Sequence, residues 1–169
     1  MQRFDAPWGR TLKIVSGLAT AVCLGITLSL WEIIATEGPE SMHFWGGLLP
    51  VLLVAMAGLF TIRGYGVDDA QLLVRRLFWQ TRLSLGDLEK VEVCPGELRQ
   101  SLRLFGNGGL FSFSGLFRHK KLGRFRAFVT DWDRTVVLHF PDRRLVVSPA
   151  NPERFVDALR LAHPHLITS

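Results

Sequence analysis

The sequence predicts a two-helix membrane hairpin followed by a cytoplasmic β domain that one C-terminal helix closes. Two long apolar runs lie in the first 62 residues, and beyond them the hydrophobic period changes from helical to alternating. An amphipathic helical pattern follows near the C-terminus. Because 48% of the 169 residues are hydrophobic and the mean hydropathy is +0.22, the composition excludes a large polytopic transporter, a collagen-like chain and a disordered chain.

The apolar runs predict membrane helices over residues 13–35 and 44–62. The stretch from Ile14 to Trp31 carries no charged residue, and at 1.5 Å per residue it approaches the roughly 30 Å apolar thickness of a bilayer. A cleaved signal peptide is the alternative for this run. It is disfavoured because the apolar core of a signal peptide has only about 7 to 15 residues.

The charges that flank the runs predict a two-pass protein of the cell (inner) membrane with both termini in the cytoplasm. Arg3, Arg10 and Lys13 lie in or beside the short N-terminal segment 1–12, whereas the loop over residues 37–43 has no Lys or Arg. Positive residues remain on the cytoplasmic side. We therefore expect only this loop to face outward.

Small residues recur every four positions on the first predicted helix, at Gly17, Ala21 and Gly25. This spacing permits close helix approach. We expect it to serve packing against the second helix, with dimerisation between chains as the alternative. Neither helix carries an ionisable group near its middle, which argues against transport.

The cytoplasmic domain is predicted over residues 64–163, with a tail over 164–169. Alternating apolar residues favour about seven strands arranged as a meander, at residues 65–67, 72–76, 81–85, 90–93, 125–129, 136–140 and 145–147. Residues 95–122 show no such pattern and are expected to be poorly structured.

The domain ends in a predicted helix that covers the open end of the sheet. Asn151 is a suitable N-cap and Pro152 suits the first helical position. Phe155 and Leu159 lie on one apolar stripe, with Arg154 on the polar side. One apolar stripe needs one surface to cover it, and an open sheet end provides that surface.

Several segments carry a resemblance to a known family: LGDLEKVE, RLFGNGGLF, GRFRAFVTD and NPERFVDAL. Together with the two preceding helices they resemble bacterial membrane-anchored proteins with a pleckstrin-homology (PH)-like domain, over residues 65–161. The resemblance implies a PH-type fold, a seven-stranded, strongly bent antiparallel sheet or open barrel capped by a C-terminal helix. It implies no functional residues.

The segment from residue 103 to 126 is the candidate site, because it combines glycines, large rings and cations. In one interpretation the rings enter the membrane interface and each cation gains about 1 kcal/mol from anionic headgroups. In the other, the rings pack within the domain or against a second copy, and the cations form a solvated face. The residues concerned are Phe105, Phe111, Phe113, Phe117, Arg118, Lys120, Lys121, Arg124 and Arg126.

Other chemistries have weaker support. The glycines lack the Gly-Lys-Ser/Thr context of a nucleotide site, and a membrane-tethered position disfavours nucleic acid. Asp131 and Asp133 flank Trp132 at a turn, where aspartates are common. Cys94 has no sequence partner and is expected to be buried and inert. We expect neither a cofactor nor a metal.

The sequence therefore predicts a non-enzymatic, membrane-tethered interaction module. Its expected partners are the bilayer and either a membrane-associated protein, which it would scaffold or regulate, or a second copy. Weak contact with anionic headgroups would assist, since residues 63–169 carry a net charge of +6 against −1 for residues 1–62. The alternative is an uncharacterised enzyme, or an accessory subunit of a membrane complex, that uses a pocket of the β domain.

Overall fold

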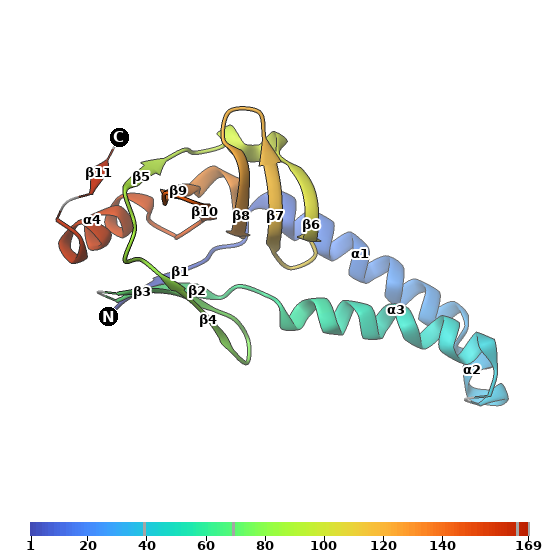
Figure 1. Ribbon diagram of the computed structural model, residues 1–169. Helices are drawn as coiled ribbons and strands as arrows, with labels where there is room; N and C mark the ends of the chain where they lie inside the picture. The colour runs from blue at the N-terminus through green and yellow to red at the C-terminus, as the bar shows by residue number, and fades with distance from the viewer. Residues whose placement is uncertain (39, 69, 165, 169) are drawn as a thin grey trace.

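The computed structural model describes residues 1–38, 40–68, 70–164 and 166–168. A long helical hairpin extends from one end of a β domain, and the N-terminus lies within that domain (Figure 1). The helices are α1 (Arg10–Ser29), α2 (Trp31–Glu37), α3 (Met42–Leu59) and α4 (Pro152–Ala162), and two 3-10 helices are η1 (Glu97–Gln100) and η2 (Trp132–Arg134).

Among the described residues the strands form two sheets. The first has the order β1-β2-β3-β4 and the second the order β11-β5-β9-β10-β8-β7-β6. Their bounds are β1 (Gln2–Asp5), β2 (Gly64–Val67), β3 (Gln71–Arg75), β4 (Gln80–Ser84), β5 (Lys90–Val93), β6 (Leu102–Gly108), β7 (Phe113–His119), β8 (Gly123–Val129), β9 (Val136–His139), β10 (Arg144–Val147) and β11 (Ile167–Thr168).

The helices α1 and α3 are both long and apolar enough to cross a membrane. The first predicted helix is shorter than expected, because the chain turns at Leu30 before α2. The second ends at Leu59, not at Ile62. Ile62 and Leu12 are completely buried in the β domain. Apolar residues where the chain leaves and re-enters the domain therefore belong to its core. The loop expected to face outward includes Pro39, which lies outside the described residues.

The small residues of α1 do not pack against α3, which corrects the expected role of this stripe. A Cβ atom added to Gly17 or Gly25 would have nothing within 4 Å, and Ala21 is exposed. The two helices meet on another face, where Thr27 Oγ1 donates a hydrogen bond to the Gly47 carbonyl at 2.7 Å. The recorded polar contact between the two helices is thus made by a hydroxyl group, and not by the stripe of small residues.

The strand predictions are correct in position but incomplete. Each of the seven predicted strands overlaps an observed one, whereas β1, β6, β7 and β11 were not predicted. The expected meander is also wrong. β4 and β5 lie in different sheets, and the β9–β10 hairpin is inserted between β5 and β8. β9 therefore pairs with β5, and β10 pairs in parallel with β8, with Leu145 opposite Arg126.

The N-terminal segment is part of the fold. β1 pairs antiparallel with β2, with Phe4 opposite Tyr65, and Ala6 is buried in the main core. A domain cut to residues 64–169 would therefore lose a strand of the first sheet.

Two apolar clusters occupy opposite faces of the second sheet. On β8, Phe128 belongs to the cluster between the two sheets, while Phe125 and Ala127 belong to the other. The helix α4 closes the first cluster with Phe155 and Leu159, both fully buried. The Asn151 side chain accepts a hydrogen bond from the amide of Arg154 at 3.0 Å. The predicted cap and apolar stripe of this helix are thus confirmed.

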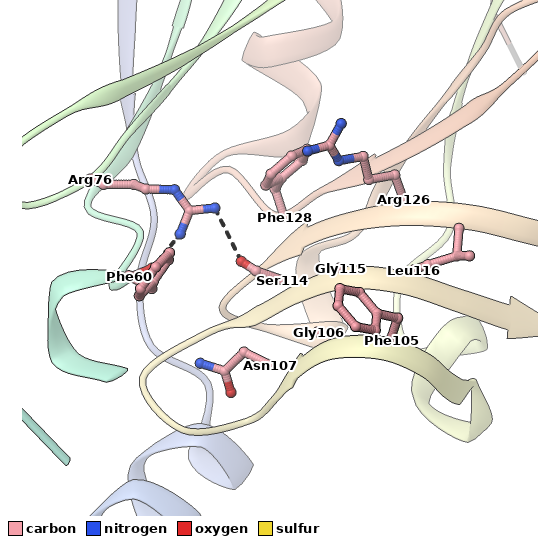
Figure 2. A pocket seen from close by; sticks show the side chains of 10 residues that line it. All are labelled: Phe60, Arg76, Phe105, Gly106, Asn107, Ser114, Gly115, Leu116, Arg126 and Phe128. Carbon is pink, nitrogen blue, oxygen red and sulfur yellow. Dashed lines mark hydrogen bonds between the residues drawn. The ribbon is translucent and has the colours of Figure 1, made fainter. Parts of the chain in front are cut away.

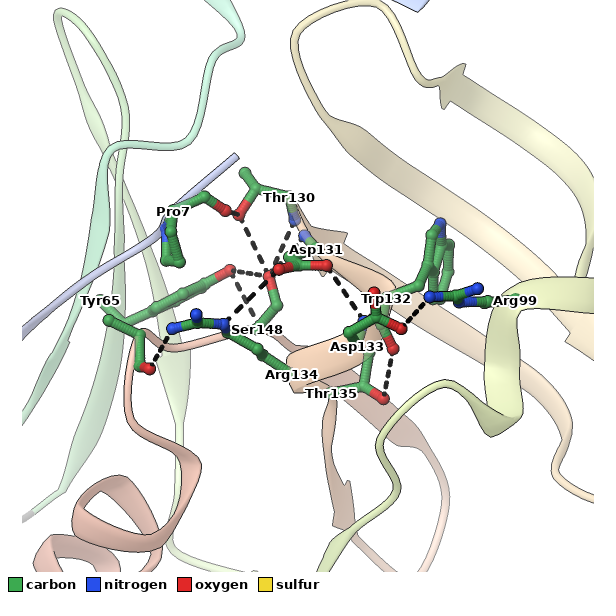
Figure 3. Close-up of polar contacts among 11 residues, drawn as sticks. Pro7, Tyr65, Arg99, Thr130, Asp131, Trp132, Asp133, Arg134, Thr135 and Ser148 are labelled. Atoms are coloured by element: carbon green, nitrogen blue, oxygen red, sulfur yellow. Dashed lines mark hydrogen bonds and ion pairs between the residues drawn. The ribbon is translucent and has the colours of Figure 1, made fainter. Parts of the chain in front are cut away.

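The Tyr65 hydroxyl joins the two sheets (Figure 3). It donates to the Phe128 carbonyl at 2.6 Å and accepts from the Ser148 amide at 3.1 Å. Ser148 Oγ accepts from the Thr130 amide at 2.8 Å, and Thr130 Oγ1 donates to the Pro7 carbonyl at 2.9 Å. Burial raises the pKa of Tyr65 to about 12. The network therefore stays neutral and connects both sheets with the N-terminal segment.

Replacing Tyr65 by Phe should lower the free energy of unfolding by about 1 to 3 kcal/mol, because it leaves buried polar groups without their partner. Urea unfolding of the full chain in detergent, followed by near-UV circular dichroism, measures this change. The exposed Arg154→Ala variant should differ from wild type by less than about 0.5 kcal/mol. Equal effects of the two substitutions would contradict the role given to the hydroxyl.

A candidate binding site between the two sheets

A cavity of about 630 Å³ lies between β6, β7 and β8 on one side and the loop after β3 on the other (Figure 2). Its walls combine aromatic rings, glycines and two guanidinium groups. The lining residues are Phe60, Arg76, Phe105, Gly106, Asn107, Ser114, Gly115, Leu116, Arg126 and Phe128.

Two glycines keep the floor of the cavity open. Gly106 and Gly115 face each other across β6 and β7, with φ angles of 106° and 145°. A Cβ atom on Gly106 would lie 2.3 Å from the Ser114 carbonyl oxygen. L-residues rarely adopt these φ values, so the close strand approach requires glycine and no side chain fills the space above it.

Arg76 is fixed at the junction of α3 with the second sheet. Its guanidinium donates to the Phe60 carbonyl at 2.6 Å and to Ser114 Oγ at 3.2 Å. Phe60 is the C-cap of α3, so Arg76 satisfies a carbonyl that the end of the helix leaves without a partner. The charge of Arg76 therefore has a defined position.

Arg126 places a second positive charge near the first. The guanidinium carbons of Arg76 and Arg126 lie 5.8 and 5.1 Å from the centre of the Phe128 ring. Burial, and secondly the charge of Arg126, lower the pKa of Arg76. In the part of the chain that the structure describes, neither arginine forms an ion pair with a carboxylate. The cavity thus holds two positive charges without a full counter-charge.

Exposed apolar side chains surround this end of the domain. The β3–β4 loop exposes 41% of Leu77, 76% of Phe78 and 38% of Trp79, and on β6 Phe105 is 80% exposed. The Trp79 ring meets that of Phe60 edge to face, with centroids 5.1 Å apart. The loop therefore borders directly on the end of α3.

The β6–β7 turn is attached to the other membrane-length helix. Ser16 of α1 donates its hydroxyl to the Gly109 carbonyl at 3.3 Å and accepts from the Phe111 amide at 2.9 Å. Phe111 has a φ of 63°, unusual for a bulky residue, and its ring lies 5.8 Å from that of Trp8. Contacts with the N-terminal region and α1 thus hold the turn in place.

The structure divides the predicted aromatic residues into different roles. Phe113 and Phe117 are buried and pack on Trp132, with ring centroids 5.2 and 5.9 Å away. They cannot reach a lipid surface, so for these two the first interpretation is wrong and the second, packing within the domain, agrees with the structure. Phe111 is half-buried, and only Phe105 presents most of its ring. Phe113 and Phe117 lie on the same face of β7, the face that packs into the second apolar cluster.

The predicted cations are separated as well. Arg118, Lys120, Lys121 and Arg124 are exposed at and around the β7–β8 turn, which Figure 1 places at the end of the strands away from the helices. Seven residues of β7 separate this turn from the β6–β7 turn, a length of about 20 Å. Only Arg126 of the predicted cations lines the cavity. The basic turn is thus not a continuation of the cavity.

The sequence analysis missed Arg76 and the loop from Leu77 to Trp79. The available signal was the run of three large apolar residues in a two-strand connection, where turns are normally polar.

Residues 63–162 match the family model of the bacterial PH domain. The chain belongs to this family. No curated protein and no solved structure matches it. The matched region begins at the connection between α3 and β2 and ends with α4, so β1 is added to the first sheet of the PH domain from outside it. The predicted resemblance is confirmed.

A smaller hollow of about 240 Å³ bears on the enzyme alternative, because Cys94 and His139 line it together with Glu92. Burial raises the pKa of Cys94 to about 11. Burial also lowers the pKa of His139, against the opposing attraction of Glu92. Both shifts favour the neutral forms, whereas a catalytic Cys–His pair requires a thiolate.

The two aspartates of the enzyme alternative have structural partners. Asp131 caps η2 by accepting from the Asp133 amide at 3.1 Å, and Asp133 pairs with Arg99. Over the described residues, no group of three or more His, Cys, Asp or Glu side chains could hold a metal ion. The geometry therefore agrees with the turn-forming interpretation.

At pH 7.5 Cys94 of the folded PH domain should react with a maleimide about a hundredfold more slowly than a thiol of ordinary pKa. The reason is that a rise of two units in the pKa lowers the thiolate fraction about a hundredfold. Stopped-flow labelling of the full-length Cys23→Ala variant measures the rate, with the urea-unfolded chain as reference. Equal rates in the folded and unfolded chains would contradict the raised pKa, and a faster rate in the folded chain would indicate an activated thiol and support the enzyme alternative.

Proposed function

We propose that this chain is a membrane-anchored interaction module in which α1 and α3 cross the bilayer and the PH domain rests against the membrane surface. The observation that carries the proposal is the position of the exposed apolar loop Leu77–Trp79, at the end of the domain from which the helices leave (Figure 1). In this arrangement the cavity opens at the bilayer interface.

The chemistry of this end fits the interface. Phe78 and Phe105 are the most exposed phenylalanines of the β domain, at 76% and 80%. Trp79, which follows Phe78 in the loop, has an apolar body and a polar N–H, the combination enriched where membrane meets water. Large exposed apolar patches are uncommon on soluble surfaces, and insertion at the interface removes these rings from water.

Two contacts fix this end of the domain relative to the helices. Ser16 holds the β6–β7 turn on α1, and Arg76 holds the start of the β3–β4 loop on the end of α3. A domain attached at two points needs little extra free energy to dock, since the anchor already supplies a high local concentration of lipid.

The distribution of Lys and Arg supports the orientation. Residues 63–169 carry a net charge of +6, and Lys and Arg are retained on the cytoplasmic side of a membrane. The weak contact with anionic headgroups is assigned to Arg76 and Arg126, the cations that line the cavity. Both termini then lie in the cytoplasm of a bacterial cell, with the protein in the inner membrane. The β7–β8 turn, with exposed Arg118, Lys120 and Arg124, points into the cytoplasm as a surface for the membrane-associated partner that the module scaffolds or regulates.

Immersion depth tests the proposal directly. Spin labels are placed by cysteine substitution at Phe78, Phe105 or Lys120 of the full chain, in a Cys23→Ala background, and the protein is reconstituted in nanodiscs that contain anionic lipid. Labels at 78 and 105 should be relaxed more strongly by oxygen than by a water-soluble nickel chelate, because oxygen concentrates in the bilayer. The label at 120 should show the reverse.

The labels share one protein and one bilayer, so position 120 is the internal control. If the labels at 78 and 105 were as accessible to the nickel chelate as the label at 120, the domain would stand away from the membrane and the proposal would fail.

A further inference from the structure

We propose that an acidic segment of a protein partner binds as an added strand along the free edge of β4, with its carboxylates on Arg124 and Arg143. The site is a second hollow, of about 230 Å³, between β4 and the first residues of β8 and β10. It meets the cavity at Leu116 and Arg126. This inference rests on the proposed function in one respect, because it gives the partner of the interaction module a chemistry and a binding place.

The backbone of β4 is open on one side. β4 is the last strand of the first sheet (Figure 1), and in the described part of the chain it pairs with β3 alone. The Ser84 carbonyl points away from β3, since it accepts from Arg143 Nη2 at 3.3 Å. Backbone groups two residues apart on a strand point the same way, so those of Arg82 and Gln80 are directed outward too. An edge of this kind is a template for a further strand.

The first sheet leaves part of the second sheet uncovered beside this edge. Phe128 of β8 is buried between the sheets, whereas Arg126 and Arg124, two and four residues earlier on the same side of the strand, are exposed. Leu116, opposite Arg126 on β7, is 39% exposed. Packed sheets lie about 10 Å apart and neighbouring strands about 4.8 Å apart, so a strand next to β4 would cover these residues.

The charges determine what the added strand must carry. Arg124 lies directly opposite Arg118 in the β7–β8 pair, an arrangement that is unfavourable for like charges. Among the described residues neither of them forms an ion pair, and nor does Arg143. The lining of the hollow contains a single described carboxylate, that of Asp142. Carboxylates on the added strand would therefore meet positive charges that lack a partner.

The geometry of a strand fits these arginines. Every second side chain of a strand faces the same way, so a segment with acidic residues at alternate positions presents carboxylates about 7 Å apart. Arginine binds a carboxylate through paired N–H donors. Single-stranded nucleic acid fits less well, because it requires exposed rings for stacking, and Phe125, the ring that lines the hollow, is buried.

The test measures the fluorescence anisotropy of a dye-labelled peptide of seven residues in which threonine and glutamate alternate. The full chain is held in phosphatidylcholine nanodiscs, whose surface has no net charge. We expect saturable binding of one peptide per chain. A peptide with the same three glutamates in one block should bind about tenfold more weakly, because one carboxylate then faces away from the arginines.

N-methylation tests the backbone contact. Two versions of the alternating peptide carry methyl groups, one on the glutamate amides and the other on the threonine amides. Only one of these sets faces β4, since amides alternate along a strand. One version should therefore lose at least about tenfold in affinity, and the other should lose much less.

Arg124→Gln should weaken binding of the alternating peptide about tenfold, the loss expected for one charged hydrogen bond, and Arg124→Glu should abolish it. Arg82→Gln is the matched control. Arg82 lies on β4 itself, but on the opposite face from Leu83, which packs against the main core. This variant undergoes the same change of charge and should change affinity less than about twofold.

Three outcomes would overturn the inference. Equal losses from Arg124→Gln and Arg82→Gln would mean diffuse attraction by a basic surface. Equal binding of the parent peptide and both N-methylated versions would mean that no strand is added. An oligothymidylate that binds more tightly than the peptide would make the surface a nucleic-acid site. Interfacial labels at 78 and 105 together with any of these results would leave the docking intact and refute the strand site alone.

Discussion

The hydrogen bonds of the Tyr65 hydroxyl hold together parts of the chain that are far apart in sequence. Tyr65 lies on the first sheet, and its partners Phe128 and Ser148 lie on or beside the second. Every polar group in this junction is buried, so each missing bond would carry the full cost of desolvation. The cavity depends on this junction too, because Phe128, whose carbonyl accepts from Tyr65, also lines the cavity.

The same junction also connects the domain with its anchor. Through Ser148 and Thr130 it reaches the Pro7 carbonyl, and the Gly9 amide donates to the Thr130 carbonyl at 3.0 Å. The helix α1 begins at the next residue, Arg10. Hydrogen bonds therefore hold the chain to the domain core up to the residue before the candidate membrane span.

The sequence was sufficient for elements with a strong period. The two apolar helices, α4 with its Asn151 cap and seven strand positions followed from local patterns. β6 and β7 did not, because the glycines that permit their close approach, Gly106 and Gly115, also remove the alternation that identifies a strand. The ends of the membrane helices were misplaced for a different reason: the sequence stays apolar through Leu30 and Ile62, although α1 ends before Leu30 and Ile62 belongs to the domain core.

The candidate site was only partly predictable. A sequence shows that a phenylalanine is present, but burial depends on the face of the strand, so Phe113 and Phe105 had the same expectation and opposite outcomes. Arg76 and Arg126 are fifty residues apart, and both reach the Phe128 ring only because the two sheets pack together. Long-range proximity of like charges has no local signature.

Hydrogen exchange at the Ser148 amide tests the central claim most directly, because this amide donates to the Tyr65 hydroxyl. If the junction governs the fold, the amide should exchange only by global unfolding, with the same free energy of opening as amides in the centre of β9. Mass spectrometry of the full chain in nanodiscs, with peptides that isolate residues 146–150, gives this value. Exchange at a markedly lower free energy than that of β9 would show that the junction opens independently, and would contradict the account.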